Sequence, residues 1–208
     1  MVLITHGGEN TEKIANILKV AQKRFGLYGL GKTTMKEIAA DLNMSKAALY
    51  YYFPDKESLF KMVVEIEQDN FFDELEANLR DISDPIEMLK CFIKNRLDMF
   101  KSFFNLSRLR FDEFREVKPL LCESLAKLKL RETEITERIL TKGRDIGLFH
   151  IEDPNEMALL FLDILRSVRG MLIHYKEFMY LEPEDYAILE KKQNELTEIF
   201  IRAMKYKE

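Results

Sequence analysis

The sequence is poor in the residues that build turns, because only eight glycines and five prolines occur among its 208 residues. A protein with many β-hairpins needs more of both residues to reverse its chain. No segment alternates apolar and polar residues over a sustained length, whereas apolar residues recur at helical spacing along most of the chain. With 47% hydrophobic and 33% charged residues, the composition is typical of a soluble helical protein. We therefore predict an all-α fold.

Long apolar runs and clusters of metal ligands are also missing. No run approaches the roughly 20 apolar residues of a membrane-spanning helix, and residues 1–10 lack the basic start of a secretory signal. Cys91 and Cys122 lie far apart, and His6, His150 and His174 form no group with the spacing of metal ligands. We expect a cytoplasmic protein with reduced cysteines and without a metal or cofactor.

The stretch GLYGLGKT at residues 26–33 matches the phosphate-binding pattern G-x-x-x-x-G-K-[ST] at every fixed position. A phosphate-binding loop needs a strand before it and a helix after it. The preceding residues 11–25, TEKIANILKVAQKRF, instead place their apolar side chains on one face of a helix, and the glycines then end that helix. A nucleotide-binding enzyme that uses residues 26–33 is therefore the less favoured alternative, and we expect no enzyme.

Two further short helices are predicted directly after this turn. Thr34 and Glu37 form a capping box at the start of one helix. Ser45 is an N-cap for the next, which Pro54 ends. Only about three residues around Asn43 separate the two helices, which is the spacing of a helix-turn-helix.

The charge distribution also sets the first part of the chain apart. Residues 1–56 contain eight Lys and Arg against five Asp and Glu, a net charge of +3, while the remainder carries −7 of the total of −4. A basic segment on an acidic body points to nucleic-acid binding by that segment.

The string TTMKEIAADLNMSKAALYYYFPDKESLF closely resembles the DNA-binding head of the TetR family of transcriptional regulators, with a match over residues 11–60. Asn43 stands where the family usually has glycine, and asparagine tolerates the left-handed backbone that such a turn needs. The later string LTKGRDIGLFHIEDPNEMA resembles the family's link between its seventh and eighth helices. The resemblance implies about nine helices, with a DNA-binding domain at residues 1–55 and a ligand-binding and dimerisation domain at residues 56–208.

The third predicted helix has a face suited to a major groove. Leu49 and Phe53, four residues apart, point inward. The opposite face carries Lys46, Ala47, Tyr50 and Tyr51. Small and polar-tipped side chains suit a helix that lies in a DNA groove. The alternative is that the tyrosines at positions 50–52 pack against the first helix.

The resemblance also assigns roles to individual residues of the head. The positions that hold the phosphate backbone in this family are matched by Thr34, Tyr50, Tyr51 and Lys56. The positions that approach base edges are matched by Lys36, Ser45, Lys46, Ala47 and Tyr52. A lysine can donate to guanine, and an alanine can contact a thymine methyl group.

The predicted ligand-binding residues lie in the window MFKSFFNLSRLRFDEF at residues 99–114. They are Met99, Phe100, Phe103, Phe104, Arg110, Phe111 and Phe114. Dense aromatic residues with a few polar groups fit a flat or lipid-like ligand, and the arginines suit an anion. Ordinary core packing explains the same aromatic stripe equally well.

The last two predicted helices carry apolar stripes wider than one packing face requires. The stripes consist of Met157, Leu160, Phe161, Ile164, Val168, Met171 and Tyr175, followed by Leu189, Leu196, Phe200 and Ala203. They resemble the four-helix dimer seam of the family, although packing within one chain explains their inner halves.

Taken together, these features predict a dimeric repressor that a small apolar or lipid-like molecule releases from a palindromic operator; an activator of the same fold is the alternative. We expect the long helix at residues 56–80 to carry the ligand's effect to the head.

Overall fold

The computed structural model describes residues 8–102, 109, 111–174 and 181–205. Within these ranges every regular element is a helix: α1 Gly8–Lys32, α2 Met35–Asp41, α3 Lys46–Tyr52, α4 Lys56–Leu79, α5 Pro85–Ser102, α7 Phe111–Asp145, α8 Pro154–Ile173 and α9 Pro183–Lys205. The predicted all-α fold is confirmed, with eight helices in the described ranges against about nine predicted. No helix among these residues is long and apolar enough to cross a membrane.

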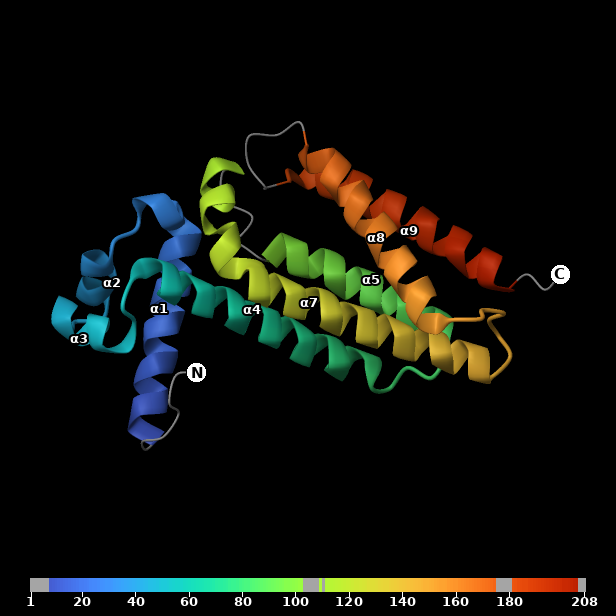
Figure 1. Ribbon diagram of the computed structural model, residues 1–208, viewed down its shortest axis with the longest axis horizontal. Coiled ribbons are helices and arrows are strands. Elements are labelled where there is room, and N and C mark those ends of the chain that lie inside the picture. The colour runs from blue at the N-terminus through green and yellow to red at the C-terminus, as the bar shows by residue number, and fades with distance from the viewer. Residues whose placement is uncertain (1–7, 103–108, 110, 175–180, 206–208) are drawn as a thin grey trace.

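The molecule consists of a small group of helices at one end and an elongated body of the remaining helices (Figure 1). Helices α1 to α3 make up this group, and α4 leads from it along the body beside α7. The contacts between α4 and α7 show that the two helices are parallel, because Glu65 accepts from Ser124 at 2.7 Å and Glu76 accepts from Arg138 at 2.7 Å further along both helices. Helix α4 therefore connects the small group of helices to the body.

Predicted helix starts are confirmed by their caps. The hydroxyl of Thr34 accepts from the backbone N–H of Glu37 at 3.3 Å, and the Glu37 carboxylate accepts from the backbone N–H of Thr34 at 2.9 Å. Ser45, Asp55 and Asp153 cap α3, α4 and α8 with a side-chain oxygen that accepts from backbone N–H groups of the first turn. Each cap satisfies backbone N–H groups that the helix itself leaves free.

The first helix extends further than its sequence indicates. It was predicted to end near Gly26, but helical structure continues to Lys32 across a kink at Gly29, where φ is 79°. Glycine adopts this left-handed conformation without a steric penalty. Because helix and not strand precedes residues 26–33, the context required by a phosphate-binding loop is absent from this described part of the chain.

The buried apolar residues form two separate clusters. The first cluster, which we call the head core, contains residues of α1, α2, α3 and the first half of α4, together with Leu109, Val117 and Leu121. The second cluster, which we call the body core, contains residues of α4 from Phe71 onward, of α5, of α7 from Ile135 onward, and of α8 and α9. Helices α4 and α7 contribute to both cores. A displacement of either helix would therefore change the packing of the head core and of the body core.

A single helix, α7, runs over Phe111–Asp145 although Pro119 lies inside it. Proline lacks a backbone N–H and clashes with the preceding turn, so it bends a helix that packing holds together. Figure 1 shows the bend in the yellow-green first part of α7. Helix α8 ends at Ile173, and residues 175–180 lie outside the described ranges.

Candidate nucleic-acid interface and effector site

The turn between α2 and α3 has the geometry of a helix-turn-helix. Asn43 adopts a φ of 53°, which confirms the left-handed turn predicted for it. The backbone N–H of Met44 closes the turn on the carbonyl of Ala39 at 3.0 Å. Leu49 is fully buried in the head core and Phe53 is 7% exposed, so these two side chains anchor α3 and fix which of its faces points outward.

Most of the predicted DNA contacts lie on the exposed surface of α2 and α3. Seven of the nine predicted residues are exposed: Thr34, Lys36, Ser45, Lys46, Ala47, Tyr50 and Tyr51. Tyr51 is 82% exposed. Such high exposure is unusual for an aromatic side chain. The Lys46 ammonium lies 5.4 Å from the centroid of the Tyr50 ring, so both groups occupy the same part of the surface.

Two predicted contact residues have structural roles in addition. Tyr52 is half-buried and packs against the head core, which is the alternative considered for it from the sequence. The Lys56 ammonium donates to the carbonyl of Leu30 at 2.9 Å and so caps the end of α1 beyond its kink. Lys56 therefore ties α4 to α1, and a contact with a phosphate would use its remaining N–H donors.

The predicted ligand-binding residues do not form one group. Met99 and Phe100 belong to the body core, whereas Phe114 packs against the head core. Phe111 begins α7. The remaining predicted residues, Phe103, Phe104 and Arg110, lie outside the described ranges. Among the described residues, the aromatic window is thus divided between the two cores.

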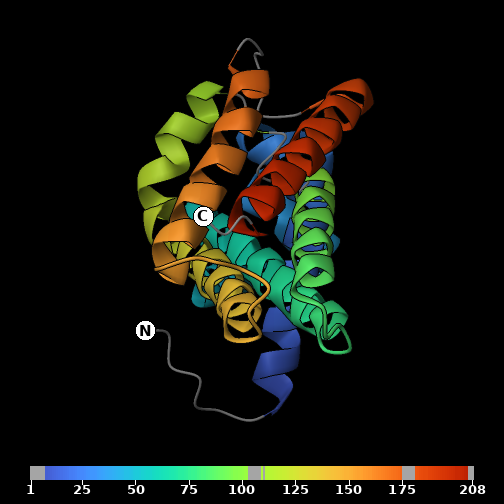
Figure 2. The same ribbon diagram turned by 90° about the vertical axis from the view of Figure 1, so that its right-hand side faces the viewer.

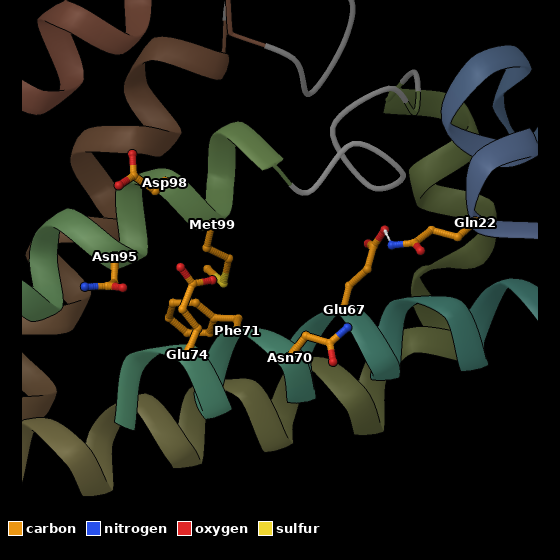
Figure 3. Close-up of a pocket in the computed structure, with 8 residues that line it drawn as sticks. All are labelled: Gln22, Glu67, Asn70, Phe71, Glu74, Asn95, Asp98 and Met99. Carbon is orange, nitrogen blue, oxygen red and sulfur yellow. Dashed lines mark hydrogen bonds between the residues drawn. The ribbon is translucent and has the colours of Figure 1, made fainter. Parts of the chain in front are cut away.

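A cleft of about 340 Å³ lies where α1, α4 and α5 meet. Its lining residues are Gln22, Glu67, Asn70, Phe71, Glu74, Asn95, Asp98 and Met99. Figure 3 shows Met99 and Phe71 close together in the middle of the cleft, with Asn95 on one side, and on the other side the amide of Gln22 donates to Glu67 at 3.0 Å. The lining is polar and acidic, and it contains only Met99 from the predicted set. The cleft therefore differs in chemistry from an aromatic pocket.

Comparison with known proteins agrees with this geometry. The family model for bacterial regulatory proteins of the tetR family matches residues 17–63, which contain the helix-turn-helix. The crystal structure of a transcriptional regulator from Cytophaga hutchinsonii ATCC 33406 is 38% identical in sequence, with a TM-score of 0.84 over 93% of this chain and 99% of that one. The chain belongs to the TetR family. The predicted family is thereby confirmed.

Two curated TetR-family relatives match only part of the chain. The regulator RutR of Escherichia coli (strain K12) is 32% identical over 109 residues, which are 52% of this chain and 51% of RutR. The regulator AcrR of Shigella flexneri is 32% identical over 83 residues, or 39% of each chain. The chain thus spans about half or less of the length of these relatives. A TetR-family regulator from Pectobacterium atrosepticum shares the fold at 20% identity, with a TM-score of 0.72 over 98% of this chain and 99% of that one.

One arginine that joins two helices of the head was not predicted from the sequence. Arg24 on α1 forms ion pairs with Asp41 and, at 3.2 Å, with Glu37, so it fixes α2 against α1. Hydrogen bonds from Thr34 lower the pKa of the Glu37 carboxyl below its ordinary value, and the positive charge of Arg24 adds to this effect. The spacing of these residues matches no local helical pattern, so only the fold brings them together.

A second group of charged residues, in the body, was also not predicted from the sequence. Arg96 and Glu132, 1% and 2% exposed, form an ion pair at 2.6 Å. Arg166 reaches the other oxygen of Glu132 at 3.0 Å. The residues come from α5, α7 and α8, so a polar network joins three helices inside an otherwise apolar core.

Proposed function

We propose that this TetR-family protein is a ligand-responsive DNA-binding regulator, acting in the cytoplasm as a repressor that a small molecule releases from a palindromic operator. The observation that carries the proposal is the outward face of α3. This face presents Tyr50, Tyr51 and Lys46 to solvent on a helix whose other side is anchored by Leu49. A rigid helix with exposed polar-tipped side chains suits recognition in the major groove.

The contacts divide into two kinds. Thr34, Tyr50 and Tyr51 would hold phosphates, and Lys56 would join them with the donors that Leu30 leaves free. Base edges would be approached by Lys36, Ser45, Lys46, Ala47 and Tyr52. Tyr52 is the least accessible of this second group, because it is half-buried against the head core.

A dimer through α8 and α9 would supply the second head. Leu160 is 52%, Met171 71% and Ile199 60% exposed, and all three are large apolar residues on these two helices. Phe161 and Leu189, which the sequence placed in the same stripes, are instead buried in the body core. Of the predicted stripes, Tyr175 lies outside the described ranges. Two heads of one dimer would meet successive major grooves about 34–36 Å apart.

The ligand's effect would reach the head through α4 and α7. Both helices pass from the body core into the head core. Gly31, just beyond the kink of α1, lies so close to α7 that a Cβ there would be 2.5 Å from the Glu113 carboxylate oxygen. This oxygen is the end of a flexible side chain, so a shift of α7 would reach α1 mainly through the head core that both helices share, in addition to any movement of α4.

The test is selection of bound sequences from a random DNA library, followed by titration of the selected sequence at several salt concentrations. We expect a palindrome and an affinity that falls linearly against salt on logarithmic axes, because each phosphate contact releases counterions. A protein that selects no sequence, or binds DNA equally well at all salt concentrations, contradicts the proposal. Binding of ATP or GTP that Lys32→Ala abolishes would instead favour the nucleotide-binding alternative.

A further inference from the structure

In the body, two arginines lie close to one aromatic ring, near the end of α5. Phe100 on α5 lies with its ring centroid 4.8 Å from the guanidinium carbon of Arg96 and 4.2 Å from that of Arg169 on α8. The hydroxyl of Tyr186 on α9 donates to the Phe100 carbonyl at 2.7 Å. Helices α5, α7, α8 and α9 each contact the next and close a ring around this point; Figure 2 shows them side by side in green, yellow, orange and red.

The charges in this group do not balance. Glu132 is paired with Arg96 at 2.6 Å and with Arg166 at 3.0 Å, and Arg166 also pairs with Asp163 at 2.9 Å. Two carboxylates thus face three arginines, and Arg169 is the one for which the described residues supply no carboxylate. Counted over the described residues, the group therefore holds one positive charge in excess.

Two nitrogen atoms of the same group also lack hydrogen-bond partners. The Nη1 atom of Arg96, a side chain that is 1% exposed, has no acceptor within the described part of the protein, and neither does the buried Nε atom of Arg169. Burial, followed by repulsion from Arg96, lowers the pKa of Arg169 to about 10. A buried donor without an acceptor destabilises the folded chain, so both atoms would gain from an acceptor that carries negative charge.

We propose that Arg96 and Arg169 bind the carboxylate of a small amphiphilic anion, and that this anion is the effector of the regulator. The proposal rests on the proposed function and narrows it to one chemical class of ligand. A single excess charge matches a monovalent carboxylate better than a doubly charged phosphate, and guanidinium groups hold carboxylates with two parallel hydrogen bonds. The ligand's apolar part would pack beside Phe100, which itself packs against the body core.

Such a ligand would act on both helices that lead to the head. Arg96 is held by Glu132 of α7, and α5 packs against α4 as well as α7. A carboxylate that draws Arg96 toward Arg169 would compete with Glu132 for the same guanidinium group. The position of α7, and with it the contact of its first part with the head core, would then depend on the ligand.

The experiment uses the full-length protein without DNA and four probes in calorimetric titrations: octanoate, benzoate, 1-octanol and octylammonium. We expect octanoate to bind the wild type at least tenfold more tightly than the alcohol or the amine of the same chain length. Arg169→Met should weaken octanoate roughly 10- to 100-fold, the loss expected when charge-assisted hydrogen bonds are removed, and should leave 1-octanol unchanged. If this variant fails to fold, Arg169→Gln gives the same comparison.

Arg131→Met is the matched control. Arg131 also lies over a phenylalanine, 4.0 Å from the centroid of the Phe72 ring, but it is paired with Asp69 at 2.7 Å and is partly exposed. The Arg131→Met variant should bind octanoate with the same affinity as the wild type. The proposal is wrong if neither octanoate nor benzoate binds the wild type at millimolar concentration. It is equally wrong if Arg169→Met binds octanoate as tightly as the wild type, or if 1-octanol binds the wild type as tightly as octanoate.

A failure of this proposal can be told apart from a failure of the proposed function. If octanoate binds through Arg169 but the protein selects no DNA sequence, the anion site stands and the regulator does not. If the protein binds an operator and a neutral or cationic molecule releases it while octanoate does not bind, the regulator stands and the anion site is wrong.

Discussion

In the head, the polar contacts that start the second helix join residues three positions apart, whereas in the body the central ion pairs join residues 36 and 34 positions apart. The head also exposes the polar side chains proposed to contact DNA, whereas the body buries Arg96 and Glu132. A short-range contact can form as soon as one helical turn forms. A long-range buried ion pair forms only when several helices have packed, and it is costly unless each charge finds a partner. The two regions should therefore respond differently to substitution.

The largest effect is expected in the body. Arg96→Met leaves Glu132 buried with Arg166 as its remaining partner, so we expect a loss of about 3–5 kcal/mol in the free energy of unfolding. Arg169→Met removes a partly buried charge for which the described residues provide no carboxylate, so the free energy of unfolding should stay unchanged or rise. Urea denaturation of both variants measures the difference. Equal effects of the same sign would show that the charge imbalance has no energetic consequence.

The next effect separates anchoring from recognition within α3. Leu49→Ala opens a cavity in the head core at a fully buried position, and we expect a loss of about 2–5 kcal/mol. Tyr51→Ala changes a side chain that is 82% exposed, so the free energy of unfolding should change by less than about 0.5 kcal/mol while operator affinity falls. Thermal denaturation and operator titration are both needed. If Tyr51→Ala keeps full affinity for the operator, its assignment as a DNA contact is wrong.

A third, smaller effect concerns the two lysines. Lys46→Ala should cost about 1–3 kcal/mol in binding to the operator and relax the preference at one base pair. Lys56→Ala should weaken operator and random DNA by the same factor, and it should also lower the melting temperature because the cap on Leu30 is lost. Lys56→Met keeps the length of the side chain and serves as a control for its packing. If Lys46→Ala weakens the binding of all DNA sequences by the same factor, Lys46 contacts a phosphate and not a base.

The smallest effect is a pH dependence in the head. Because the pKa of folded Glu37 lies below its ordinary value, its carboxylate stabilises the protein above the unfolded pKa, and this contribution is lost as the pH falls through the folded pKa. Glu37→Gln should therefore be less stable than the wild type at pH 7, and the difference should vanish in acid. Glu152→Gln, at an exposed loop position, is the control and should show no such convergence. A difference that persists unchanged in acid would mean that Glu37 acts without its charge.

The sequence by itself determined the features that depend on neighbouring residues. The caps at Thr34, Ser45 and Asp55 and the left-handed turn at Asn43 follow from side chains that bond to backbone groups within three residues or from the conformational range of one residue. The outward face of α3 follows from helical periodicity once Leu49 is placed inside. These local preferences act before any long-range contact exists, so they can be derived from the order of residues alone.

Only the tertiary structure decided how these elements combine. Pro119 lies within α7 rather than at its start, because packing on both cores holds the helix together across the missing hydrogen bond. Lys56 caps α1 from 26 positions away, and Arg24 holds α2 from 17 positions away. The aromatic window is split between the two cores, and its Phe100 meets Arg169 from a helix that begins more than 50 residues later. Such contacts arise from the packing of distant segments, and no local spacing in the sequence encodes them.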